Sequence, residues 1–267
     1  MHPLIDLAKQ TCYRGSDINA RLIEPTSGKD SDEFIAAANA LVHDLEHYPH
    51  AFVLACILDT SVAADVAWTI PLRVKEALGT FDINQLYAVK LEHYVELFSG
   101  ERKWHRYPAR SAKFFYEGVK RIVENEQMKG NASVMWEGKP SSQEIVLRFM
   151  EFKGCGFKIA NMAPNLLYRY FGVEFSDYRF FDIAPDVHTT RVFSRLGLTP
   201  ATSNAEAAKI YTICSARELN PEFPGIVDSV CWKAGRTYCS PSNPKCEECP
   251  LKAFCKHFQK QKEAMEE

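Results

Sequence analysis

The sequence predicts an all-α protein, and three observations lead to this prediction. Apolar residues recur at helical spacing along most of the chain, and alternating strand patterns are scarce. Glycine, proline and serine punctuate the gaps between the helical runs. With 267 residues, of which 46% are hydrophobic, the chain is also long enough to bury a substantial core. We therefore expect a globular protein built of helices.

The first clear helix start is Ser31, which is followed by Asp32 and Glu33. A serine hydroxyl can cap the first free N–H groups, and acidic side chains favour the first turn. This run continues to Tyr48. Further helical runs are expected at residues 52–58, 62–78, 110–126, 143–152, 157–171, 187–196, 204–219 and 226–234. The segment 129–142, rich in glycine, proline and serine, is expected to be a loop, and the charged tail 256–267 a frayed, solvated end.

The bulk charge gives no sign of a nucleic-acid partner. The net charge is −2 and the isoelectric point is about 6.5, so any nucleic-acid binding must depend on a local basic patch. No stretch reaches the roughly 18 apolar residues of a membrane span, and no basic segment precedes an apolar run at the N-terminus. We expect an intracellular, cytoplasmic protein with no membrane partner.

The cysteines indicate a metal centre near the C-terminus. Disulfides are a poor explanation for nine cysteines in a reducing compartment. Four of them, Cys239, Cys246, Cys249 and Cys255, form a compact C-x6-C-x2-C-x5-C run. Four thiolates suit either a [4Fe–4S] cluster or a tetrahedral zinc, and thiol chemistry alone does not separate the two. The remaining cysteines lack such spacing and receive no assigned chemistry: Cys12, Cys56, Cys155, Cys214 and Cys231.

Two glycines, Gly154 and Gly156, separate two helical runs, and Lys158 follows two residues after the second. Glycines permit a tight turn and close approach, and the N–H groups at the next helix start can face a phosphate. Taken alone, the pattern is better explained by an ordinary helix–helix turn, because Gly-x-Gly is common. A dinucleotide-binding loop is disfavoured, because Ile159 occupies the third glycine position and no strand precedes.

A second candidate feature is Asp186, which directly precedes the helical run 187–196. Taken alone, an aspartate at this place is most simply a helix N-cap. Asp182, four residues earlier, is a weaker candidate for any role that needs a carboxylate.

In this order, the hairpin, the aspartate and the cysteine loop resemble the helix-hairpin-helix DNA glycosylases of the endonuclease III type. The family's L-P-G-V-G-x-K-T-A-N hairpin is matched here by F-K-G-C-G-F-K-I-A-N, and its V-D-T-H-x-x-R-V segment by P-D-V-H-T-T-R-V. All three cysteine gaps match as well. The chain departs from the family at Phe152, Lys153 and Cys155. The 28 positions from Lys158 to Asp186 also exceed the expected spacing, which indicates an aromatic insertion at 168–184.

The resemblance implies a two-lobed helix-hairpin-helix glycosylase fold. Residues 31–170 would form a six-helix barrel lobe that ends in the hairpin. Residues 1–30 and 171–267 would form a discontinuous iron–sulfur lobe. The four cysteines of the C-terminal run would bind a [4Fe–4S] cluster, which the matched gaps favour over zinc.

The implied activity is that of a bifunctional DNA glycosylase and abasic-site lyase in base-excision repair. Lys158 would attack C1′ of the deoxyribose and form a Schiff base. Asp186 would stabilise the positive charge that develops on the sugar and help to deprotonate the lysine. The expected partner is double-stranded DNA with a damaged base or an abasic site, bound by a monomer of this nucleoid-associated protein.

The DNA contacts that we expect come from the hairpin and from two further places. Gly154 and Gly156 would admit a phosphate, and Arg236 and Lys245 would form a basic patch beside the cysteine loop. Val62 lies in a segment that faintly resembles the family's L-L-S-A-Q-A-T-D, and it would act as an apolar wedge in place of the glutamine.

Two alternatives stay open. The first is a monofunctional glycosylase or a base-modifying relative on the same fold, which the long spacing from Lys158 to Asp186 allows. The second is a non-catalytic DNA-binding module, and the presence of both Lys158 and Asp186 argues against it.

Overall fold

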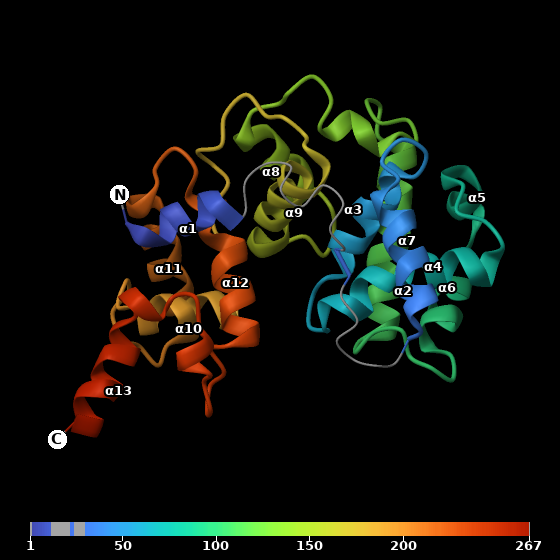
Figure 1. The fold of residues 1–267 in the computed structure, drawn as a ribbon. Helices are drawn as coiled ribbons and strands as arrows, with labels where there is room; N and C mark the ends of the chain where they lie inside the picture. The colour runs from blue at the N-terminus through green and yellow to red at the C-terminus, as the bar shows by residue number, and fades with distance from the viewer. Residues whose placement is uncertain (1, 12–21, 24–29, 267) are drawn as a thin grey trace. The chain divides into compact units, whose positions relative to one another are not determined.

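The computed structural model describes residues 2–11, 22–23 and 30–266 (Figure 1). In these residues the regular structure consists of α-helices and short 3₁₀ turns, without strands, so the all-α prediction is confirmed. Cys12 lies outside the described residues. The α-helices are α1 (Pro3–Thr11), α2 (Asp32–His43), α3 (Pro49–Leu58), α4 (Ala64–Leu78), α5 (Ile83–Ala88), α6 (Leu91–Ser99), α7 (Pro108–Glu124), α8 (Ser142–Met150), α9 (Phe157–Phe171), α10 (Val187–Leu196), α11 (Ala205–Leu219), α12 (Asp228–Thr237) and α13 (Lys256–Glu266).

The described residues divide into two compact units. Unit 1 comprises residues 2–11, 141–146 and 164–266, and unit 2 comprises residues 22–23, 30–140 and 147–163. The boundaries between the two lobes predicted from the sequence are after residues 30 and 170. One change of unit falls at Pro164, inside α9. Proline lacks a backbone N–H and crowds the carbonyl four residues earlier, so the helical hydrogen bonding is interrupted where the chain passes between units.

Unit 2 is built around α3. Every residue from Pro49 to Leu58 is buried, as expected for a helix that is apolar on all sides. It packs against α2, α4 and α7. The α6–α7 contact adds an aromatic group in which Phe98 and Phe115 are fully buried, with ring centroids 5.8 Å apart. These contacts give α3 a fixed position, and its C-terminal end therefore provides a rigid support for a site.

The core of unit 1 is formed mainly by α1, α10 and α12. Its helix α10 runs from Asp186 at the N-cap to Gly197 in the left-handed conformation at the C-cap, with the bounds that the sequence predicts. Three rings of the aromatic segment 168–184 are buried in this unit, those of Tyr170, Phe175 and Phe181. Phe175 and Phe181 lie edge to face at 4.9 Å. The ring of Phe180, by contrast, is 51% exposed.

Several expected elements differ from the structure. The run expected to reach Tyr48 ends at His43, with Asp44 as its C-cap. Tyr48 itself is the N-cap of α3, as expected for the residue before a proline, which disfavours helical geometry there. The tail is not frayed, since it forms α13, which contacts α10. The short helices α5 and α6 were not predicted, because six and nine residues show too little periodicity. Within the described part of the chain, no helix has the length and apolarity needed to cross a bilayer.

Candidate active site and metal centre

The hairpin between α8 and α9 uses its two glycines differently. Gly154 has a φ of +95°, and a Cβ on it would lie 2.8 Å from Cδ2 of Phe114. Nothing lies within 4 Å of the place where a Cβ on Gly156 would stand. Phe152 and Cys155 are both buried in the apolar interior. The fold therefore needs the first glycine, whereas the second leaves its backbone open to solvent.

The two glycines therefore give a matched pair of variants. Gly154→Ala should lower the free energy of unfolding by about 1–3 kcal/mol, because its backbone conformation is strained for an L-residue and Phe114 must move. Gly156→Ala should leave stability nearly unchanged, because nothing lies within 4 Å of the added methyl group. It should weaken binding to duplex DNA, because the methyl group would stand where a DNA phosphate is expected to approach the hairpin backbone. Urea unfolding and fluorescence anisotropy measure the two effects. Equal stabilities of the two variants would contradict this assignment.

One face of α7 holds the hairpin in place. Phe114, Glu117 and Arg121 are spaced three and four residues apart, so they lie on the same side of the helix. Glu117 pairs with Lys153 at 3.2 Å, and Arg121 pairs with Glu151. Lys153, which replaces the family's proline, is thus tied to α7.

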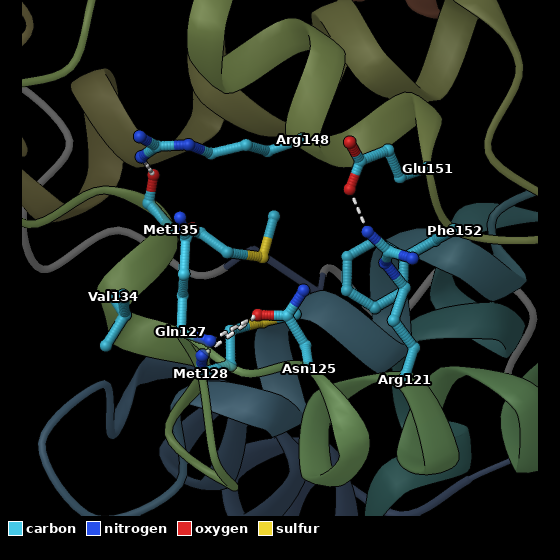
Figure 2. Close-up of a pocket in the computed structure, with 9 residues that line it drawn as sticks. All are labelled: Arg121, Asn125, Gln127, Met128, Val134, Met135, Arg148, Glu151 and Phe152. Atoms are coloured by element: carbon cyan, nitrogen blue, oxygen red, sulfur yellow. Dashed lines mark hydrogen bonds and ion pairs between the residues drawn. The ribbon is translucent and has the colours of Figure 1, made fainter.

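Figure 2 shows a polar pocket where this arrangement meets the loop after α7. Arg148 donates a hydrogen bond to the Met135 carbonyl, and the Asn125 side chain accepts from two backbone N–H groups (Figure 2). Burial lowers the pKa of Arg121. None of the residues predicted to be catalytic or to contact DNA lines this pocket, which we interpret as a structural tie between α7, α8 and the intervening loop. Its lining residues are Arg121, Asn125, Gln127, Met128, Val134, Met135, Arg148, Glu151 and Phe152.

Lys158 lies in the first turn of α9, with 37% of its side chain exposed. Its Nζ stands 3.7 Å from Oδ1 of Asp59, the residue that caps the C-terminal end of α3. Asp59 is only 7% exposed, and its Oδ2 accepts a hydrogen bond of 3.2 Å from Nε1 of Trp68. All three residues belong to unit 2. The structure thus places a half-exposed lysine beside a buried, anchored carboxylate.

Two thiols and one imidazole near this pair are neutral because they are buried. Burial raises the pKa of the Cys56 thiol far above its usual value and that of Cys155 to about 12. Burial also lowers the pKa of His105, whose Nε2 lies 3.2 Å from the Leu58 carbonyl oxygen. At neutral pH the two thiols and the His105 imidazole therefore add no charge beside the Lys158–Asp59 ion pair.

Asp186 is the N-cap of α10 in unit 1. Its Oδ1 accepts hydrogen bonds of 2.8 Å from the backbone N–H groups of His188 and Thr189, and the Thr189 hydroxyl accepts from the Asp186 N–H. This reciprocal arrangement is a capping box. Among the described residues no contact to Oδ2 is found, so one oxygen caps the helix and the other is available.

Asp182, the weaker candidate, is engaged elsewhere. It is 3% exposed and forms a bidentate pair with Arg217, at 2.7 Å from Nε and 2.6 Å from Nη2. This hydrogen bonding raises the pKa of Arg217. We assign the pair to the structure of unit 1, since both carboxylate oxygens are already used.

The cysteine loop brings its four sulfurs into one neighbourhood. Burial raises the pKa values of Cys246 and Cys249, and the nearby Cys239 and Cys255 sulfurs raise them further. Such crowded thiols are ready ligands for iron or zinc, which stabilise the thiolate form. No three His, Cys, Asp or Glu side chains in the described residues stand close enough to hold a single ion, so the choice of metal rests on the cysteine spacing and on the comparison below.

Two arginines of α10 bind the cysteine loop. Arg191 donates to the Cys239 carbonyl at 2.6 Å, and Arg195 donates to the Ser240 carbonyl at 2.8 Å. Nη1 of Arg195 also lies 3.2 Å from Sγ of Cys239. Because Asp186 caps the same helix, the cysteine loop and the candidate carboxylate are fixed to one rigid element.

The residues expected to contact DNA differ in their exposure and in the charge of their neighbours. Lys245 is exposed, but Glu247 and Glu248 are exposed close by in sequence, so this surface is less basic than predicted. Arg236 is half-buried and stacks over Trp232 at 5.0 Å. Val62 is half-buried in the turn between α3 and α4. Their roles stay predictions.

Comparison with known proteins identifies the fold and the loop. Residues 239–255 match the iron–sulfur binding domain of endonuclease III. A trapped covalent intermediate of endonuclease III with DNA superposes with a TM-score of 0.59, covering 97% of this chain and 96% of that chain at 17% identity. The chain therefore has the fold of endonuclease III. The match confirms the prediction of a [4Fe–4S] cluster loop at residues 239–255. That Cys239, Cys246, Cys249 and Cys255 are its four ligands stays a prediction.

Two further structures share the endonuclease III fold. A non-covalent endonuclease III–DNA complex has a TM-score of 0.50 at 18% identity, covering 98% of this chain and 95% of that one. A thermostable thymine-DNA glycosylase has a TM-score of 0.52 at 11% identity, covering 85% and 97%. No curated protein sequence matches the chain. At these identities the likeness establishes the fold.

Sequence reasoning missed three features of the site. Asp59 belongs to the segment that resembles the family only faintly, so it was not predicted to take part in the site. The signal that could have identified it is its place directly after the apolar helical run 52–58. The contacts of Arg191 and Arg195 with the cysteine loop were also missed. Their spacing of four residues places them on one face of α10, which is the signal that could have indicated a common partner. The hairpin-binding face of α7 gave no signal, because its ion pairs join residues about 30 positions apart.

Proposed function

We propose that this protein is a DNA base-excision enzyme, a bifunctional glycosylase and abasic-site lyase that uses Lys158 as its nucleophile. The observation that carries the proposal is the place of Lys158, in the first turn of the helix after the Gly-x-Gly hairpin and beside a buried carboxylate. The endonuclease III fold supports the proposal, since the DNA complexes of endonuclease III share this architecture.

The substrate base must leave the duplex before it can be attacked, and unstacking costs least at a damaged or mismatched base. The neutral amine of Lys158 then attacks C1′, the bond from C1′ to the base breaks, and the base leaves with that electron pair. Asp186, with one oxygen fixed by the capping box, supplies a negative charge for the cationic sugar. When bound, the cluster stabilises the loop that α10 holds through Arg191 and Arg195.

The experiment that tests this function uses duplexes with single lesions or one abasic site. Purified protein should release a damaged base and cleave the strand at an abasic site, with both products resolved on a denaturing gel. Binding of every duplex without base release or cleavage would support a non-catalytic DNA-binding module and contradict the proposal.

A monofunctional glycosylase is the second candidate, and the Lys158–Asp59 ion pair favours it. A lysine held as an ammonium is no nucleophile, so water could attack the sugar instead. Base release without any covalent enzyme–DNA product under borohydride would identify this reaction.

DNA binding should weaken as salt rises, because phosphates exchange counterions for protein cations. Lys245→Glu should weaken binding further and lower the salt slope by about 1 or more, as expected when a phosphate contact is lost. Lys209→Glu, a charge reversal on α11 outside the loop, is the matched control. Titrations at several salt concentrations compare the slopes. Equal slopes for the two variants would remove Lys245 from the DNA contact.

A further inference from the structure

The proposed role of Lys158 as a nucleophile conflicts with its ion pair in the structure. A nucleophilic amine must be neutral, whereas in the structure Lys158 forms an ion pair with the Asp59 carboxylate at 3.7 Å. A group that receives the ammonium proton is therefore needed when the substrate binds. The geometry of unit 2 indicates which group this is.

We infer that Asp59 is the proton acceptor and positioning group for Lys158, a role that sequence reasoning assigned to Asp186. The inference rests on the proposed function and deepens it. The two groups face each other across 3.7 Å within one unit, and Asp59 is the buried partner. Asp186 caps a helix of the other unit and keeps the electrostatic role at the sugar.

The position of Asp59 is suited to this role, because its oxygens have different tasks. Trp68 donates to Oδ2 and fixes the plane of the carboxylate, so Oδ1 is left directed at the amine. Asp59 also ends a fully buried helix, and its own N–H donates to the Cys56 carbonyl at 3.1 Å. The carboxylate is thus preorganised toward a lysine whose side chain can still move.

The proton transfer follows from desolvation. In the free protein, water reaches the 37% of the Lys158 side chain that is exposed and stabilises the ion pair. DNA bound over the lysine removes that water, and a desolvated ion pair tends toward its neutral form. One proton then passes from Nζ to Oδ1, giving a neutral amine and a neutral carboxylic acid. The freed electron pair forms the bond to C1′ as the base departs with the electrons of its own bond.

The neighbouring groups do not compete for this proton. The thiols at positions 56 and 155 would hold a proton too tightly to exchange it, since burial raises their pKa values, and burial lowers the pKa of His105. Asp65 is buried in the first turn of the adjacent α4. The titratable and charged groups on the elements around the pair are Cys56 on α3, Asp65 on α4, His105 before α7, Arg110 on α7 and Cys155 in the hairpin.

The test is single-turnover trapping on duplex DNA with one abasic site, with borohydride as the reductant, followed from pH 6 to pH 10. Asp59→Asn keeps the shape and can still accept the Trp68 hydrogen bond. It should slow trapping at pH 7 by about 10²-fold, the usual contribution of a general base. The loss should shrink as pH rises, because hydroxide replaces the missing acceptor. Asp59→Glu should restore part of the rate, and Asp82→Asn, at the cap of α5, is the matched control.

Each result has a distinct meaning. A loss for Asp59→Asn that is the same at every pH shows a purely structural aspartate and overturns the inference. Trapping at the native rate overturns it as well, while the proposed function survives if Lys158→Gln is inactive. If the native protein forms no covalent product but cleaves or releases bases, the lyase proposal itself fails, and the role of Asp59 fails with it.

Discussion

Lys158→Gln should abolish covalent trapping on abasic DNA and reduce strand cleavage by at least about 10³-fold, because it removes the group that forms the new bond in the transition state. Stability should change little, since the side chain is 37% exposed and makes one ion pair. Removing the ammonium leaves the buried Asp59 carboxylate without its ion-pair partner, so a small destabilisation should accompany the loss of activity.

The matched control is Lys120→Gln, which removes an exposed lysine from α7 of the same unit. Trapping, strand cleavage and thermal unfolding are compared for the native protein and both variants. Cleavage by Lys158→Gln at the native rate on abasic DNA would show that the nucleophile is a different residue.

Cys249→Ala should cause the largest loss of stability. The native protein should be brown and contain about four irons per chain. Cys249 packs against the core of unit 1 together with Cys239, Cys255 and Phe254, so the cysteine loop is part of that core. Losing a ligand should remove the iron and destabilise unit 1 by at least about 3 kcal/mol, because metal binding and folding are coupled.

Iron analysis and the visible absorption spectrum measure the cluster, and thermal unfolding measures the stability. Cys214→Ala is the control, because this exposed cysteine on α11 lies outside the loop. It should keep its iron and its stability. Stoichiometric zinc without iron in native protein purified anaerobically would contradict the cluster assignment.

The sequence predicted those parts of the fold in which local signals agree. Asp186 and Gly197 end α10 at the expected residues, because a capping aspartate and a left-handed glycine are local signals. The cysteine loop was likewise readable, since its four ligands lie within 17 consecutive residues. Where one short segment carries a feature, spacing and residue type suffice to predict it.

The parts that were missed depend on contacts between distant segments. The Lys158–Asp59 pair joins residues about 100 positions apart, and no periodicity links them. From the sequence, Asp182 was a second candidate for the catalytic carboxylate beside Asp186. Only the structure shows that it pairs with Arg217, 35 positions later. The tail forms α13 and contacts α10, although its charged composition favoured a frayed end, and most of its residues are exposed as predicted. Tertiary packing decides such features.

The central claim, that Lys158 forms a Schiff base with DNA, is tested most directly by mapping the covalent product. The native protein is incubated with abasic duplex DNA and borohydride, digested, and the modified peptide is sequenced by mass spectrometry. The proposed function predicts a single deoxyribose adduct on Lys158, in the peptide that follows Gly156. An adduct on any other lysine or on the N-terminal amine, with Lys158 unmodified, would contradict it.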